Sequence, residues 1–265
     1  MPVSSKSRKN PTKAEQRAAT IEQILDAAEA LFSKHGFYGV TLKDVAKAVG
    51  VHHSLLNYYY KDKKALFDVV FARRAVVTSE RRMKALDEYE AHVDGKPTVE
   101  GALRTFLNTD LDLYIEGDEG WKNYGTLGAL VANTPQWGAE LMDQYFDPVV
   151  LKLMGLLRDA LPKAAKDDLF WGYHFVTGAL MLTLARTGRI DKLSDGACQS
   201  EDFAAVKQRM ALFMAAGFIA TCAPRKQALD QFAALLATQT SENEPRVQKG
   251  EQPKRRKRRS AAPGE

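Results

Sequence analysis

Residues 41–63, TLKDVAKAVGVHHSLLNYYYKDK, constrain the fold more than any other part of the chain. Thr41 can cap a helix, and Asp44 three residues later resembles the second half of a capping box. The apolar residues that follow recur at i, i+3, i+4 and i+7 and form one stripe: Leu42, Val45, Ala46 and Val49. Gly50 stands where a helix commonly ends in the left-handed conformation. The pattern therefore predicts a short helix, a tight turn and a second helix.

The second helix, expected from about His53 to Tyr59, carries polar side chains on one face. Leu56 would face the core. His53, Ser54 and Asn57 would share the outer face, because residues three and four positions apart are neighbours on a helix. Asn makes bidentate contacts to adenine, and Ser can bond several base edges. This layout is typical of a helix-turn-helix that reads the major groove of DNA, although an ordinary helical hairpin with a polar face would show the same stripe.

Aromatic and basic side chains beside this face suit the DNA backbone. Tyr58 and Tyr59 offer hydroxyls to phosphate oxygens. Asp62 would cap the next helix and place Lys63 in its first turn, where backbone amides and an ammonium form a natural phosphate site. The hairpin therefore carries groups for base edges and for phosphates.

Residues 21–72 resemble the N-terminal DNA-binding domain of the TetR family of bacterial repressors. The matching stretches are Ile24–Ala28 with Leu31, Phe32 and Gly36, then Thr41–Val51, Leu56–Tyr60, and Lys63 with Leu66 and Phe67. This sequence departs from the family pattern at His52, where a Ser or Thr cap is usual, and at Asn57, where an aromatic residue is common. With the resemblance, the expected DNA-binding residues are Thr41, His52, His53, Ser54, Asn57, Tyr58, Tyr59 and Lys63.

The rest of the chain shows helical periodicity, without a strand pattern or an internal repeat. Helices are expected over residues 21–34, 63–89, 99–115, 121–132, 135–161, 166–187 and 202–223. The predicted fold class is all-α, with a three-helix DNA-binding domain and a larger helical ligand-binding and dimerisation domain. The expected divisions are a basic disordered arm (1–17), the helix-turn-helix domain (18–65), the effector-binding and dimerisation domain (66–236) and a basic disordered tail (237–265).

The net charge of +5 is distributed unevenly. Residues 1–20 hold five basic residues against one acidic residue, and residues 245–265 hold eight against two, so the remainder is net negative. Lys9, Lys13 and Arg17 could bind phosphates or enter the minor groove. The run PKRRKRR at 253–259 is either a solvated tail or a source of non-specific DNA affinity.

The larger domain is expected to bind a small molecule. Its helices are rich in aromatic residues with a few polar residues among them, and an apolar cavity with a few placed polar groups is the usual form of a ligand site. Plain core packing is the alternative. The expected lining residues are Phe106, Asp110, Tyr114, Tyr124, Leu127, Trp137, Leu141, Tyr145 and His174. This chemistry favours a mainly apolar effector, such as a fatty acid or acyl derivative, an aromatic compound or a drug.

The last two long helices, near 166–187 and 202–223, are expected to form a homodimer interface. Their large apolar residues are Leu180, Leu182, Leu184, Met210, Phe213, Met214 and Phe218, and their small residues are Gly172, Gly178, Ala179 and Gly217. Family members pair through such helices. A symmetric dimer would read two half-sites of a palindromic double-stranded DNA operator.

Other classes of protein fit the sequence less well. Asp110 with His174, or His174 with Cys198 or Cys222, could form a catalytic pair, but no glycine-rich phosphate loop or nucleophile elbow supports an enzyme. His52 and His53 are adjacent and point in different directions, so neither a metal site nor a cofactor is expected. A ligand-independent architectural DNA-binding protein remains the alternative. The two cysteines, the absence of an apolar run near 18 residues and the absence of a secretory signal favour a cytoplasmic protein without a membrane span.

Overall fold

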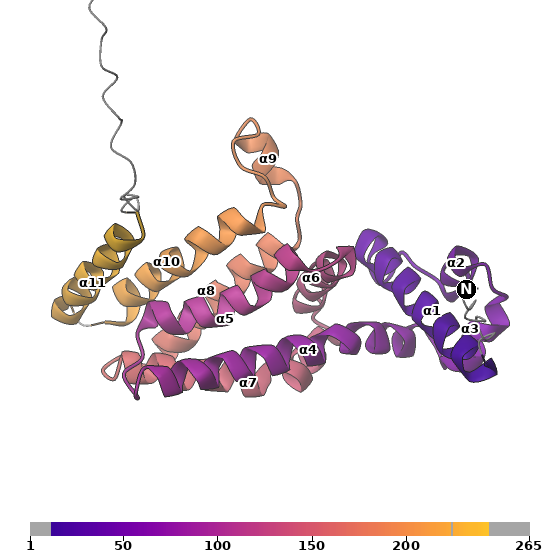
Figure 1. The fold of residues 1–265 in the computed structure, drawn as a ribbon, viewed down its shortest axis with the longest axis horizontal. Coiled ribbons are helices and arrows are strands. Elements are labelled where there is room, and N and C mark those ends of the chain that lie inside the picture. The colour runs from indigo at the N-terminus through magenta and orange to yellow at the C-terminus, as the bar shows by residue number, and fades with distance from the viewer. Residues whose placement is uncertain (1–11, 224, 244–265) are drawn as a thin grey trace, which may run out of the picture.

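The computed structural model describes residues 12–223 and 225–243, and these residues form an all-α structure without a strand (Figure 1). The helices are α1 (Lys13–His35), α2 (Leu42–Val49), α3 (His53–Tyr59), α4 (Lys63–His92), α5 (Val99–Glu116), α6 (Glu119–Ala132), α7 (Gly138–Ala160), α8 (Lys166–Leu184), α9 (Arg189–Leu193), α10 (Phe203–Cys222) and α11 (Arg225–Asn243). Helices α1–α3 form a small unit at one end, and α4 runs from this unit into a larger helical domain (Figure 1). The predicted all-α fold with two domains is confirmed.

The turn between α2 and α3 forms for the local reasons that the sequence indicates. The Thr41 hydroxyl accepts a hydrogen bond from the Asp44 backbone N–H at 3.3 Å, and the Asp44 carboxylate accepts one from the Thr41 N–H at 2.8 Å. These two bonds complete the capping box. The Thr41 hydroxyl also donates to the Asp44 carboxylate at 2.6 Å, and this bond, together with that from the Thr41 N–H, lowers the pKa of Asp44. Gly50 ends α2 with a φ of 76°, in the left-handed region that favours glycine. The helix-turn-helix is therefore specified locally by its cap and its glycine.

An aromatic cluster joins the small unit to the larger domain. The Phe67 ring, fully buried in α4, has its centroid 5.1 Å from that of Phe32 in α1 and 5.3 Å from that of Phe37 in the following loop. Trp137, which precedes α7, packs on Phe37 and on Phe67, with centroids 5.1 Å apart in both pairs. Edge-on ring contacts of this kind add to the stabilisation that apolar burial provides. Trp137 therefore links the start of α7 to the DNA-binding unit.

A buried carboxylate makes a second link between the domains. Glu29 of α1 is 2% exposed and accepts hydrogen bonds from Arg73 at 2.9 Å and from Arg74 at 2.7 Å, both in α4. The Arg74 guanidinium also lies 4.7 Å from the ring centroid of Trp121 near the start of α6. Two guanidinium groups offset the cost of burying this charge, and their planar geometry orients α1 against α4. Helices α1, α4 and α6 are thus tied at one point.

The beginning of α1 differs from the prediction. Thr12 and Glu15 form a capping box, so the helix starts at Lys13. Residues 13–17, which the sequence analysis assigned to a disordered arm, are therefore helical. Residues 1–11 of that arm lie outside the described residues.

The later helices differ from the prediction at three places. Helix α7 starts at Gly138 rather than Pro135, because Trp137 has a φ of −149° and lies outside the helical region. The loop expected at 188–200 contains the short helix α9. Helix α11 was not expected; its buried Leu235 packs on the core, and the helix continues past residue 236 into the proposed tail. The tail beyond residue 243, including the basic run at 253–259, is outside the described part of the chain.

Helix α10 is the most apolar long helix among those described. Its mean hydropathy over an 18-residue window is 1.3 with 33% of that window buried, so it has the length and composition of a membrane span, contrary to the prediction that no segment would qualify. The core helices of soluble proteins pass the same test. In the structure α10 packs against α5 and α8 and leaves Phe213 exposed. One apolar face therefore contributes to the core and another is presented at the surface.

Candidate functional site

The first candidate surface is the outer face of α3. Leu56 is fully buried and anchors the helix, while His53, Ser54, Asn57 and Tyr58 are exposed. Tyr58 is 74% exposed, which is high for an aromatic side chain. Four polar side chains on one short helix therefore face away from the core, in the arrangement that contact with base edges requires.

His52 takes the place of the usual hydroxyl cap of α3. Its Nδ1 accepts a hydrogen bond from the Ser54 N–H at 3.4 Å and lies 2.8 Å from the Ser54 hydroxyl oxygen. The ring of His52 also lies beside that of His53, with centroids 4.5 Å apart. A ring nitrogen thus satisfies one of the free N–H groups at the start of the helix. This contact restrains the Ser54 side chain before any DNA is bound.

Two of the expected phosphate-binding residues already have partners. The Tyr59 ring is half-buried, and the Arg17 guanidinium lies 5.2 Å from its centroid. The Lys63 ammonium donates to the Phe37 carbonyl at 2.8 Å and lies 4.4 Å from the Phe37 ring centroid. An ammonium has three N–H groups, so Lys63 keeps donors for a phosphate while being held against the loop between α1 and α2. DNA contact by either residue stays a prediction.

Tyr38 is an additional exposed aromatic residue on this loop. It is 73% exposed, and its ring centroid lies 5.9 Å from the Lys63 ammonium. The sequence does not predict a role for Tyr38, because a single aromatic residue in a loop has no periodicity. Its position next to Lys63 makes its hydroxyl a further candidate for a phosphate contact.

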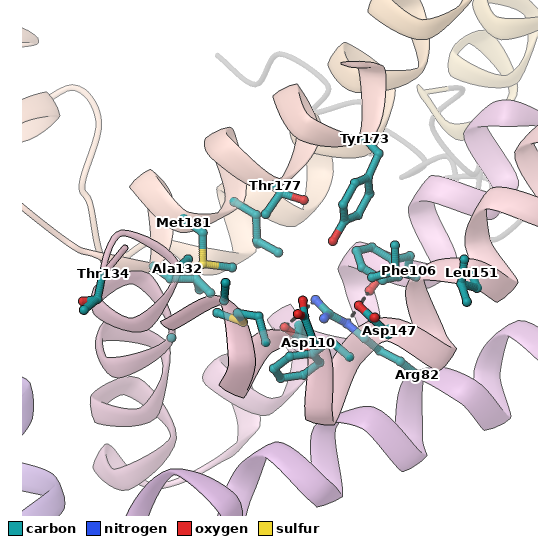
Figure 2. A pocket seen from close by; sticks show the side chains of 18 of the residues that line it. Arg82, Phe106, Asp110, Ala132, Thr134, Asp147, Leu151, Tyr173, Thr177 and Met181 are labelled. Atoms are coloured by element: carbon teal, nitrogen blue, oxygen red, sulfur yellow. Dashed lines mark hydrogen bonds and ion pairs between the residues drawn. The ribbon is translucent and has the colours of Figure 1, made fainter. Parts of the chain in front are cut away.

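The second candidate site is a cavity of about 560 Å³ between α4, α5, α6, α7 and α8 (Figure 2). Of the nine expected lining residues, four lie on its wall: Phe106, Asp110, Tyr114 and Tyr124. Tyr173 points from α8 into the cavity, and Thr177 and Met181 of the same helix also line it (Figure 2). Most of the wall is apolar or aromatic, as is usual for small-molecule sites.

The other five expected lining residues lie elsewhere: Leu127, Trp137, Leu141, Tyr145 and His174. Leu127 and Leu141 are buried in the core, and Trp137 belongs to the aromatic cluster between the domains. Tyr145 packs towards Phe71, with ring centroids 6.0 Å apart. His174 follows Tyr173 on α8, and adjacent helical residues point about 100° apart. Tyr173 therefore faces the cavity, whereas His174 is exposed and does not line it.

An ion pair forms the buried end of the cavity wall. Arg82 Nη2 donates to Asp110 Oδ2 at 2.6 Å, and Arg82 Nε donates to the Phe106 carbonyl at 3.2 Å. The guanidinium also lies 4.1 Å from the Phe106 ring centroid. Burial raises the pKa of Asp110 to about 6, although the charge of Arg82 opposes this shift. The second carboxylate oxygen, Asp110 Oδ1, is buried and has no hydrogen-bond partner in the described part of the chain.

Arg82 is not among the lining residues predicted from the sequence. It lies in the second half of α4, which is rich in charged residues. Helical spacing is the signal that indicates its burial. One face of α4 continues through this half as a buried stripe: Phe71, Ala75, Thr78, Arg82 and Leu86. One arginine in such a stripe indicates a buried partner of opposite charge.

The structure does not bring the expected catalytic pairs together. Asp110 is bonded to Arg82 inside the larger domain, whereas His174 is on the exposed face of α8. Cys198 is exposed and Cys222 is buried, and burial raises the pKa of the Cys222 thiol to about 11. Within residues 12–223 and 225–243, no group of three His, Cys, Asp or Glu residues could hold a metal ion.

Comparison with known protein families matches both domains. A model described as "Bacterial regulatory proteins, tetR family" matches residues 24–70, and one described as "Tetracyclin repressor-like, C-terminal domain" matches residues 104–217. The HTH-type transcriptional regulator AcrR of Shigella flexneri is 35% identical over 79 residues, which is 29% of this chain and 34% of AcrR. The negative transcriptional regulator IcaR of the Staphylococcus aureus icaADBC biofilm operon is 38% identical over 47 residues, 18% of this chain and 25% of IcaR. The chain thus spans about a third of AcrR and a quarter of IcaR.

Solved structures share the fold at low sequence identity. A putative transcriptional regulator from Pseudomonas aeruginosa PAO1 superposes with a TM-score of 0.51 and 16% identity, covering 80% of this chain and 96% of that one. A putative tetR family regulator from Shewanella sp. PV-4 gives 0.50 and 14%, covering 83% and 97%. The two family models match the helix-turn-helix unit and the larger helical domain in the same order as the structure has them. The chain therefore belongs to the TetR family of transcriptional regulators, which are DNA-binding proteins rather than enzymes.

Proposed function

We propose that this chain is a cytoplasmic homodimeric repressor that binds a palindromic operator and leaves it when a mainly apolar small molecule fills the cavity between α4 and α8. The main support for this proposal is that α4 extends from the DNA-binding unit to the cavity. This one helix begins at Lys63 in the DNA-binding unit and carries Arg82 in the cavity wall. A ligand against Arg82 and a DNA phosphate against Lys63 would therefore act on the same helix.

Contacts along α4 support a coupling between the two sites. Arg73 and Arg74 bond Glu29 of α1, and Arg74 lies over Trp121 of α6, the helix that also carries Tyr124 in the cavity wall. Ligand can shift operator affinity only if it binds one arrangement of the domains better than the other. A coupling free energy of about 1–3 kcal/mol is typical of such systems. In this proposal a change in the tilt of α4 alters the spacing of the two recognition helices.

The cavity suits a small molecule with a large apolar part. Its volume of about 560 Å³ lies inside the range of roughly 300–1,000 Å³ usual for ligand sites. Burial raises the pKa of Tyr114 and of Tyr124, so both hydroxyls stay neutral and can donate or accept hydrogen bonds. The apolar wall makes a fatty acid or an acyl derivative a candidate effector, together with aromatic compounds and drugs.

Operator selection with and without candidate ligands tests the proposed function. The full chain is expected to enrich a pseudo-palindromic sequence from random double-stranded DNA, and a ligand that fills the cavity is expected to release it. Weak sequence preference would favour the architectural alternative. Selected DNA that stays bound at saturating concentrations of every cavity ligand would contradict the effector role.

The proposed dimer interface rests on an exposed apolar face of α8 and α10. Trp171, Phe175 and Leu182 of α8 are 58%, 60% and 69% exposed, and Phe213 of α10 is 73% exposed. A Cβ atom at Gly178 would meet open space in the described subunit, so another backbone can approach it. An apolar face of this kind usually marks a contact between proteins.

Some of the residues expected at the interface lie inside the subunit instead. Leu180, Leu184 and Phe218 are at most 2% exposed. A Cβ atom at Gly172 would lie 2.6 Å from the Phe218 ring, so this glycine serves packing between α8 and α10 within one subunit. The exposed stripe on α8 recurs at i, i+4 and i+11, on the side of the helix opposite Leu180 and Leu184.

The double variant Leu182→Arg/Phe213→Arg is expected to convert the dimer to a monomer. Two charges per subunit at a desolvated interface leave guanidinium groups without partners, and association does not offset that cost. Sedimentation at micromolar concentration measures the change, and circular dichroism checks the fold. Val76→Arg, an exposed apolar residue on α4, serves as the control and is expected to remain dimeric. A monomeric wild-type chain would refute the dimer.

A further inference from the structure

The charged side chains on the cavity wall are mostly acidic. Among the described lining residues they are Arg82 from α4, Asp110 from α5, and Asp143 and Asp147 from α7. The Lys166 ammonium lies 5.9 Å from the ring centroid of Phe170, which lines the cavity, but Lys166 itself does not line it. Three carboxyl groups against one guanidinium make this apolar cavity a poor environment for a negative charge.

Arg82 is already engaged by two acceptors of the cavity wall. Its guanidinium bonds Asp110 Oδ2 and the Phe106 carbonyl, and it covers one face of the Phe106 ring. An anion that took Arg82 would leave Asp110, which is 3% exposed, as an unpaired buried carboxyl. Asp110 Oδ1 already lacks a hydrogen-bond partner among the described residues, so the buried end of the wall carries an acceptor that has no donor.

Asp143 and Asp147 form an acidic pair at the solvent side of the cavity. They are exposed and four positions apart on α7, so they lie on the same face of the helix. Like charges at this spacing repel each other, and a cation between them relieves the repulsion. Phe170 and Tyr173 of α8 line the same cavity, and aromatic faces attract cations. In Figure 2 Tyr173 points from α8 into the cavity space, and Asp147 lies on its wall.

We infer that the cavity binds a hydrophobic cation, with its apolar part against the buried aromatic wall and its positive charge at Asp143 and Asp147. The inference rests on the proposed effector role of the cavity and narrows the class of effector. A fatty acid of the same length would place its carboxylate beside these two aspartates. Hydrophobic cations and fatty acids can have the same apolar part, so the sign of the ligand charge distinguishes these two classes of effector.

Calorimetry with three ligands that share one tail tests the inference. Dodecyltrimethylammonium, dodecanoate and dodecyl maltoside are titrated into the full chain below their micelle concentrations. The cation is expected to bind tightest. In Asp143→Asn/Asp147→Asn its affinity is expected to fall about tenfold, as for the loss of two partly exposed ion pairs, while the affinity for dodecyl maltoside changes little. Glu140→Gln/Asp159→Asn makes the same charge change on α7 outside the cavity wall and serves as the matched control.

The outcomes separate this inference from the proposed function. Dodecanoate binding as tightly as the cation, or an equal loss of cation binding in the control variant, would overturn the cation site and leave the effector cavity standing. No binding by any of the three ligands would overturn both. Cation binding that depends on Asp143 and Asp147 but never releases the selected operator would support the ligand class and contradict the effector role.

Discussion

Replacing Arg82 with methionine is expected to lower the free energy of unfolding by about 3–5 kcal/mol at neutral pH, because removing one member of a buried ion pair leaves the other uncompensated. Arg82 and Asp110 are 5% and 3% exposed, and Arg82 Nη2 lies 2.6 Å from Asp110 Oδ2. Methionine keeps much of the apolar stem that packs on Phe106. The expected loss therefore comes from the carboxyl group left behind rather than from a new cavity.

The loss should depend on pH in a defined direction. Burial raises the folded-state pKa of Asp110 to about 6 from a reference value of 3.8, so its contribution to stability is fully present below about pH 4 and is lost as the pH rises through about 6. Without Arg82 the folded-state pKa rises further, because the opposing positive charge is gone. Arg82→Met is therefore expected to be more destabilising at pH 8 than at pH 5.

Urea unfolding followed by circular dichroism at the two pH values measures both effects. Lys84→Met makes the same change at an exposed position of α4, where little loss is expected. The double variant Arg82→Met/Asp110→Leu removes both charges and should recover most of the stability. Equal losses at pH 5 and pH 8 would show that Asp110 is not the source.

The sequence predicts the helix-turn-helix well because its determinants are local. The Thr41–Asp44 capping box, the left-handed Gly50 and the buried Leu56 act within a few residues of each other. The cavity depends instead on how distant helices rotate against one another. Phe106, Asp110 and Tyr114 were found because i, i+4 and i+8 positions share a face of α5. Tertiary packing decides which neighbouring helix places a side chain against Asp110. The periodicity of α5 therefore cannot predict that this side chain is Arg82.

The residues wrongly predicted to line the cavity also show that periodicity does not predict tertiary packing. Trp137 has the composition of a ligand-site residue, but it fills the space between Phe37 and Phe67. That space exists only once α4 carries the DNA-binding unit up to the start of α7. His174 and Tyr173 are adjacent in sequence, and only the rotation of α8 decides which of the two faces the cavity. The aromatic content of these helices therefore indicates a packed or ligand-filled interior. It does not show which residues line the cavity.

Asn57→Ala is expected to weaken binding to the selected operator by about 2–6 kcal/mol for the dimer, because a bidentate contact to a base discriminates by about 1–3 kcal/mol and each half-site would lose one. That range corresponds to about 30-fold up to about 10⁴-fold in affinity. Asn57 is exposed on α3, so the free energy of unfolding should change by less than about 0.5 kcal/mol. Binding to unrelated DNA should hardly change, since phosphate contacts supply it.

Fluorescence anisotropy at one salt concentration, with the selected operator and with single-base variants of it, measures the specific part of this loss. Asn57→Ala should bind the operator and one class of base variant with similar affinity, because the side chain that distinguished them is gone. Tyr58→Phe is the matched control on the same helix: losing one phosphate-directed hydroxyl should weaken binding to every sequence by a similar small factor. If Asn57→Ala instead lowered affinity equally for all sequences, Asn57 would contact the backbone, and the base reading would have to come from His53 and the restrained Ser54.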